Sequence, residues 1–226
     1  MIHRILRSAA AVTILTASVG LCQSPSPAAP TDQEGKHLLG IVPNYRTSPS
    51  LTNYKPLTVR EKFGVAAQDS WDRGTLLLAA MVGAENQLTN SNRAFGHGTA
   101  GFGRYLGASY GDFVIGNYMT EAVFPSFLHQ DPRYFRRGTG GAWSRLGYAI
   151  GQSFRTHNDS GRSQFNYSEW LGNSAAVAIS NSYYADNRNA RDNVSQLGAQ
   201  VGLDTAGNIL KEFYPEILRR FTRRHQ

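Results

Sequence analysis

Glycines at four-residue spacing are the feature that most constrains the fold of this chain. They lie in the stretch 98–129, where Gly103, Gly107 and Gly111 would share one narrow strip of an α-helix. Glycine costs a helix about 1 kcal/mol per position relative to alanine, so the spacing needs a compensating reason. Close approach by another helix supplies such a reason, and we expect these three glycines to be helix-packing positions.

Small residues recur at the same spacing in three other stretches. These are Gly147 and Gly151; Gly172, Ala176 and Ser180; and Gly198, Gly202 and Ala206. The repetition predicts an all-α fold, a compact bundle of about five helices packed through Gly/Ala/Ser faces. A glycine-rich β protein is the alternative, but period-two alternation is poor and the capping signals favour helices.

The clearest helix start is at Thr58, which forms a capping box with Glu61. The helix that begins there is predicted to reach about Leu88, and its apolar stretch 76–82 is expected to be deeply buried. Asp69 and Asp72 lie on its first half, where they could ligate a metal, face solvent or hold an arginine.

Further helices are expected at about 142–156, from Asn166 to about 184, and from Asn189 onward. Pro125 should kink the glycine-stepped helix, because proline cannot donate to the carbonyl of residue 121. Asp131 before a proline is typical of an N-cap and predicts a short helical turn.

The N-terminus has the pattern of a secretory signal peptide, residues 1–22. A basic start is followed by the small and apolar run Ser8–Leu21. Lipidation of Cys22 or an uncleaved anchor are alternatives, but Leu21 fits a lipoprotein signal poorly and the run is short for a span. We therefore expect an exported protein of the periplasm or outer membrane.

The mature chain is expected to contain three parts. Residues 23–57 form a Pro/Ser/Asn-rich arm, 58–218 a helical domain and 219–226 a basic tail. Cys22 is the single cysteine, so its removal would exclude disulfides, thiolate metal sites and cysteine nucleophiles.

Basic residues point to an anionic partner, because the net charge is +7, and loss of Arg4 and Arg7 with the signal would leave +5. The candidate anion-binding residues are Arg133, Arg136, Arg137, Arg219, Arg220, Arg223 and Arg224. The expected partner is anionic lipid, lipopolysaccharide or a cell-wall polymer. Nucleic acid fits by charge alone, but export argues against it, and an exposed glycine strip would favour a homo-oligomer.

Glu121 and His129 are the nearest approach to a catalytic pair, since both lie on the side of the helix that Pro125 interrupts. The competing explanation is that Glu121 pairs with an arginine on another helix and His129 caps the end of its own helix.

No nucleophile elbow, metalloprotease motif, phosphate loop or dinucleotide fingerprint is present. We therefore expect no cofactor and no metal site. The favoured function is a non-enzymatic structural or binding module of the cell envelope; the alternative is an envelope hydrolase or lipid-modifying enzyme that uses Glu121 and His129.

Overall fold

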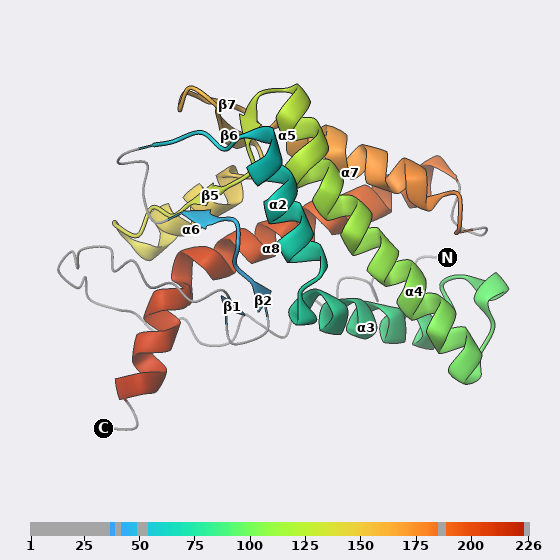
Figure 1. The fold of residues 1–226 in the computed structure, drawn as a ribbon. Coiled ribbons are helices and arrows are strands. Elements are labelled where there is room, and N and C mark those ends of the chain that lie inside the picture. Colours follow the sequence, from blue (N-terminus) through green and yellow to red (C-terminus); the bar gives the residue numbers. More distant parts are fainter. Residues whose placement is uncertain (1–36, 39–41, 49–53, 185–188, 224–226) are drawn as a thin grey trace.

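The computed structural model describes residues 37–38, 42–48, 54–184 and 189–223 (Figure 1). The predicted signal peptide, Cys22 and Arg224 lie outside the described residues. The described part is mostly helical with a few short strands, which confirms the helical class. The helices are α2 (Val59–Ser70), α3 (Arg73–Leu88), α4 (Gly98–Asn117), α5 (Phe124–Phe127), α6 (Ala142–Gly151), α7 (Tyr167–Ser180) and α8 (Ala190–Arg223). A 3-10 turn, η3, covers Arg93–Phe95, and a π-helical segment, η4, covers Tyr118–Val123.

Short strands tie the arm and the loops to the helices. The strands are β1 (His37–Leu38), β2 (Val42–Pro43), β3 (Thr47–Ser48), β4 (Gln130–Asp131), β5 (Tyr134–Phe135), β6 (Arg155–Asn158) and β7 (Ser163–Phe165). β1 pairs with β2 antiparallel, β3 pairs with β5 parallel, and β4, β6 and β7 form an antiparallel sheet in that order. The described part of the arm is therefore a strap on the domain.

Capping side chains set the helix starts. The Thr58 hydroxyl accepts from the Glu61 amide at 3.3 Å, and the Thr58 amide donates to the Glu61 carboxylate at 2.8 Å, which confirms the capping box. The single helix predicted from Thr58 to Leu88 is two helices, because Asp72 accepts from the Gly74 amide at 2.7 Å and starts α3.

The predicted kink at Pro125 takes the form of a π-helical turn. The amide of Phe124 donates to the carbonyl of Met119, five residues back, and the widened turn η4 ends two positions before the proline. Such turns occur where an α-helical hydrogen-bond ladder is interrupted. α4, η4 and α5 thus form one long rod with a widened turn (Figure 1). The helical turn predicted at Asp131 is wrong, because Asp131 lies in β4.

Helices do approach one another closely at glycine, but at positions other than the predicted strip. A Cβ on Gly83 of α3 would lie 3.1 Å from the Leu106 Cα of α4, and one on Gly172 of α7 would lie 3.0 Å from the Met119 carbonyl carbon of η4. Gly103, Gly107 and Gly111 would meet no described atom within 4 Å. The close packing expected at these three positions is therefore not formed within the described chain, because α3 and α7 contact other sides of the rod.

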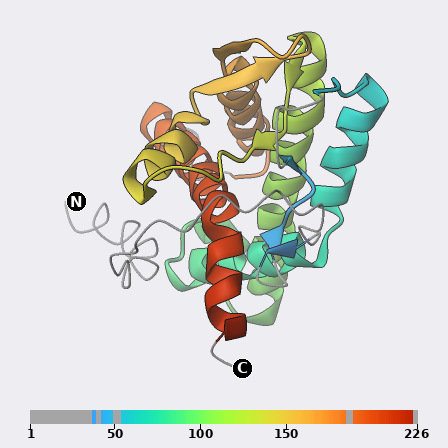
Figure 2. The same ribbon diagram turned by 90° about the vertical axis from the view of Figure 1, so that its left-hand side faces the viewer.

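The elements pack around the rod formed by α4, η4 and α5. η4 contacts both α2 and α7, while α3 packs against α4 and α8 packs against α6 and α7. Figures 1 and 2 show α8 running across the molecule toward the C-terminus.

The interior combines aromatic side chains with many small and polar ones, while many large aliphatic side chains are exposed. The largest fully buried side chains are Tyr105, Lys62, Gln130, Glu121 and Glu212. The apolar stretch 76–82 is not deeply buried as expected: Ala79 is inside, but Leu76 is 50% and Met81 62% exposed. Helix α3 therefore packs through its small side, Ala79 and Gly83, and turns its large side outward.

Candidate functional site

A buried arginine from the arm is the centre of the most unusual group in the structure. Arg46 lies between β2 and β3 with its side chain 12% exposed, and its Nη1 is 3.2 Å from Glu121 Oε1. Its Nε lies 3.9 Å from Asp69 Oδ2, and its Nη2 lies 3.9 Å from Asp204 Oδ1. Together with two further charged side chains these residues form the Arg46 cluster: Arg46, Asp69, Glu121, Glu169, Asp204 and Lys211.

Each acid of the cluster comes from a different element. Asp69 is on the inner side of α2, and Glu121 is in η4, where the widened turn buries three successive residues, 120–122. Glu169 is on α7 and Asp204 on α8, and the amide of Asn173 donates to both carboxyl groups at 3.3 Å. The cluster therefore joins the strap, α2, η4, α7 and α8.

Burial dominates the electrostatics of the cluster. It raises the pKa of Glu121 well above its usual value, and the neighbouring Asp69 adds to the rise. Burial and Asp204 do the same to the pKa of Glu169. Burial, helped by Arg46, lowers the pKa of Lys211 to about 8. These directions mean that carboxyl groups of the cluster hold protons more tightly than free ones.

Two carboxyl oxygens in the cluster have no donor. Asp69 Oδ1 and Glu121 Oε2 are buried and find no hydrogen-bond partner among the described groups. An unsatisfied buried oxygen costs about 1–3 kcal/mol, so both atoms call for a further partner.

A hollow beside the cluster is too small for a substrate. It is lined by Arg46 and Glu169 together with Ser168, Asn208 and Arg155, and it encloses about 30 Å³. A water molecule needs about 10–15 Å³ of such space, whereas sites for small molecules enclose about 300–1,000 Å³. The hollow therefore has room for water but not for a substrate.

The structure does not bring the predicted catalytic pair together. Glu121 is 2% exposed and pairs with Arg46, whereas the side chain of His129 is 83% exposed and lies 3.7 Å from Asp159. His129 also adopts a left-handed backbone (φ 52°) where the helix has ended. The competing explanation, an arginine partner for Glu121, matches the structure, although the arginine comes from the arm and not from a helix.

The arginines predicted to bind anions have different environments. Arg133 Nη2 is 2.6 Å from Asp131 Oδ2, and its guanidinium covers Tyr54 and Phe135, so its charge is met within the protein. Arg136 is half-buried, and Arg137 is exposed with Nη1 donating to Ser144 at 3.1 Å.

In the C-terminal tail the structure describes one side chain of the predicted anion-binding set. Arg219 is exposed at the end of α8. The side chains of Arg220 and Arg223 lie outside the described part, as does Arg224, so the role of the tail stays a prediction.

Sequence reasoning singled out two of the six residues of the cluster and missed four. Glu121 and Asp69 were singled out, and an arginine partner was among the options for both. Arg46, Glu169, Asp204 and Lys211 were missed. Lys211 gave a signal, because it is a charge directly after the apolar Ile209 and Leu210 on the inner side of a helix.

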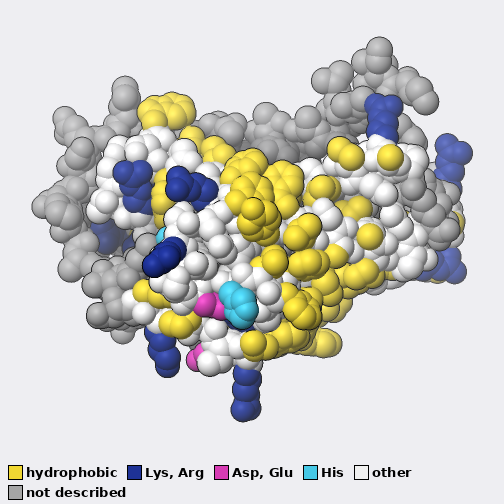
Figure 3. All heavy atoms as spheres, turned by 90° about the horizontal axis from the view of Figure 1, so that it is seen from above, with side chains coloured by type: hydrophobic (Ala, Val, Ile, Leu, Met, Phe, Trp, Pro, Cys, Tyr) yellow, Lys and Arg dark blue, Asp and Glu magenta, His cyan; other side chains and the backbone are white. Residues whose placement is uncertain are grey.

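The outer surface is the second candidate site. Helix α2 buries Lys62 and Asp69 and exposes Val59 (56%), Phe63 (40%) and Trp71 (74%). Figure 3 shows hydrophobic side chains gathered across the centre and one side of the upper face. Large exposed apolar areas mark sites of association with proteins or membranes.

Comparison with protein-family models, curated proteins and solved structures gives no match to this chain. Among the described residues, no group of three or more His, Cys, Asp or Glu side chains is arranged to hold a metal ion. In the same part of the chain, no helix combines the length and apolar character needed to cross a membrane.

Proposed function

We propose that this protein is a non-catalytic module of the cell envelope that is exported and associates with an anionic lipid surface. The observation that carries the proposal is the distribution of side chains: ion pairs, small residues and a few aromatic rings lie inside, whereas many large aliphatic residues are exposed. Helices pack in this way where the surroundings are themselves apolar, because large apolar side chains then gain nothing by facing inward.

The inversion repeats from helix to helix. α7 buries Glu169, Gly172 and Asn173 and exposes Leu171 (45%) and Ile179 (40%). The described part of α8 likewise buries Lys211 and Glu212 and exposes large apolar residues, namely Val194, Leu203 and Leu218. A feature shared by α2, α3, α7 and α8 suits an extended lipid surface better than a single partner protein, which would cover one patch.

Exposed arginines next to the apolar side chains of α2 favour an anionic lipid surface. Arg60 and Arg73 are exposed at the two ends of the α2 stripe of Val59, Phe63 and Trp71. Apolar and aromatic side chains between arginines are typical of helices that lie in a membrane interface, where each basic residue contributes about 1 kcal/mol near anionic lipid.

The hydrolase alternative gains no support from the geometry. Glu121, the candidate acid, is buried and paired with Arg46, whereas His129, the candidate base, is exposed to solvent. The hollow at Glu169 has room for water only.

The proposal is tested by flotation of the full mature chain with lipid vesicles. We expect binding to vesicles that contain anionic lipid, and weaker binding to zwitterionic vesicles or in high salt. Trp71→Ser should reduce the affinity at least about tenfold, because a large aromatic group leaves the lipid.

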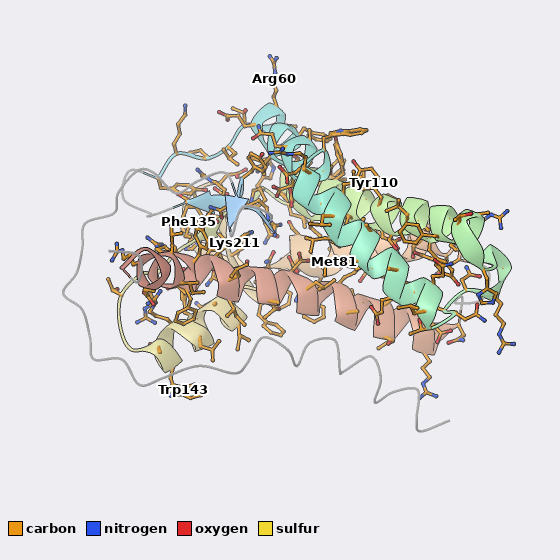
Figure 4. All side chains as sticks on the ribbon, turned by 90° about the horizontal axis from the view of Figure 1, so that it is seen from below. Arg60, Met81, Tyr110, Phe135, Trp143 and Lys211 are labelled. Atoms are coloured by element: carbon orange, nitrogen blue, oxygen red, sulfur yellow. The ribbon has the colours of Figure 1, made fainter. Side chains whose placement is uncertain are left out.

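Trp143→Ser is the matched control. Trp143 is 84% exposed on α6 and projects from the edge opposite Arg60 in Figure 4. Trp143→Ser should leave vesicle binding unchanged if the α2 stripe is the contact face. A variant that lacks residues 219–226 measures the contribution of the basic tail to vesicle binding separately from that of the α2 stripe. Absence of wild-type binding to every vesicle, while lipopolysaccharide or a second copy is bound, would refute the lipid assignment.

A further inference from the structure

Two pairs of carboxyl groups come together within the Arg46 cluster. Asp69 and Glu121 both face the Arg46 guanidinium, at 3.9 Å from Nε and 3.2 Å from Nη1. Glu169 and Asp204 both accept from the Asn173 amide at 3.3 Å. An ionised carboxylate accepts hydrogen bonds and donates none, so two neighbouring carboxyl groups repel each other unless one of them holds a proton.

The donorless oxygens support the first pair independently. Asp69 Oδ1 and Glu121 Oε2 have no donor among the described groups, although the two residues are only 7% and 2% exposed. One proton shared by the two carboxyl groups satisfies both oxygens at once. The second pair is held in register by the Asn173 amide, which lies 3.3 Å from an oxygen of Glu169 and 3.3 Å from one of Asp204.

The net charge of the Arg46 cluster also indicates two bound protons. Charged groups reach Glu121 from every element around it: Arg46 on the strap, Asp69 on α2, Glu169 on α7, and Asp204 and Lys211 on α8. With four ionised acids and two cations the cluster would carry a charge of −2, which is costly to bury. Two protons make it neutral.

We propose that the Arg46 cluster is a binding site for two protons, one shared by Asp69 and Glu121 and one held by Glu169. The folded protein keeps both protons at neutral pH and releases them when it unfolds. Protons are thus part of the core that joins the strap to α2, η4, α7 and α8.

The sign of the pH dependence follows from this. Burial raises the pKa of Glu121 and of Glu169 above the unfolded values. Their stabilising effect is complete below the ordinary carboxyl range and is lost as the pH rises through the raised values. Between those limits each retained proton makes the unfolding equilibrium constant rise up to tenfold per pH unit.

The test counts the protons released when the full mature chain is unfolded by denaturant in weakly buffered solution at pH 7. Relative to wild type, Glu121→Gln should release one proton fewer, Glu169→Gln one fewer, and the double variant two fewer. Glutamine is the fitting substitute, because its amide donates where the shared proton did. Glu85→Gln, on the exposed side of α3, is the matched control and should release as many protons as wild type.

Infrared spectroscopy of the folded wild type keeps the test decisive if a variant fails to fold. We expect a protonated-carboxyl band at pH 7 that disappears on unfolding. Absence of that band, or equal proton release by wild type and both single variants, would overturn the proposal.

Discussion

Glu121 and Glu212 are both buried carboxyl groups in the helical domain, but the protein compensates the cost of burying them in opposite ways. Glu212 on α8 accepts four hydrogen bonds, from the Tyr134 hydroxyl at 2.7 Å, the Arg137 amide at 3.0 Å, the Gly138 amide at 2.9 Å and Arg145 Nε at 2.8 Å. Each oxygen receives two donors, so the ionised form is fully satisfied.

Glu121 has a different set of neighbours. It has one ion pair, to Arg46, and its second oxygen has no described donor, while Asp69 lies beside it. The difference shows two ways to bury a carboxyl group: donors from a loop stabilise the anion at Glu212, and a shared proton removes the charge at Glu121.

The largest expected effect comes from neutralising Glu212. Glu212→Gln should destabilise the protein by about 3–5 kcal/mol, because the amide would turn a donor toward donors and remove the carboxylate that accepts from the buried Arg145 Nε, which leaves Glu216 as the acid on this arginine. Glu121→Gln should change the stability at pH 7 by less than about 1 kcal/mol, since a protonated acid is replaced by a neutral amide. Urea unfolding at pH 7 measures both.

Equal losses for the two variants would break the comparison. That result would mean that Glu121 is ionised in the fold and that Arg46 alone balances it.

Local signals in the sequence predicted much of the fold. Thr58 with Glu61 marked the start of α2, and Asn166 caps α7, its Oδ1 accepting from the Glu169 amide at 3.2 Å. These signals work because cap and capped amide lie within three residues. The side chain of Glu169 could not be placed in this way, because its partner Asp204 is 35 positions away.

Most residues of the Arg46 cluster could not be predicted for the same reason. Arg46 lies in a stretch rich in Pro, Ser and Asn, and nothing near it in sequence requires it to enter the core. The apolar surface was missed for another reason: reading 76–82 as buried assumes that large apolar residues face inward, and Leu76 and Met81 do not. Small residues at Ala79 and Gly83 carry the packing instead.

Removing Arg46 should give a smaller effect that depends on pH. Arg46 lowers the pKa of Asp69, Glu121 and Glu169, so without it these carboxyl groups hold protons more tightly. Arg46→Gln should therefore cost about 3 kcal/mol at pH 8 and roughly half that at pH 5, where protons replace the lost cation.

Arg145→Gln is the matched comparison, because without the arginine both oxygens of Glu212 still accept hydrogen bonds, Oε2 from Tyr134 and the Arg137 amide and Oε1 from the Gly138 amide. Its cost should vary little between pH 5 and pH 8. A loss at Arg46 that is the same at both pH values would show that the cluster does not take up protons in place of the arginine.

The smallest effects are expected at glycine, and they have opposite signs. A Cβ at Gly172 would lie 2.8 Å from Thr120 Cγ2 and 3.0 Å from the Met119 carbonyl carbon, next to Glu121. Gly172→Ala should destabilise the protein by about 1–3 kcal/mol through overpacking, and it should also alter the pH dependence, because it pushes η4 away from the cluster. Gly103→Ala should stabilise the protein by up to about 1 kcal/mol, because helix propensity rises and the new methyl group meets no atom of the described residues within 4 Å. Thermal and urea unfolding at pH 5 and pH 8 measure both variants. If Gly103→Ala is destabilising while Gly172→Ala is neutral, the glycine strip at 103–111 is covered by another molecule in solution, and the side of α4 that looks open in the single chain is the one that packs.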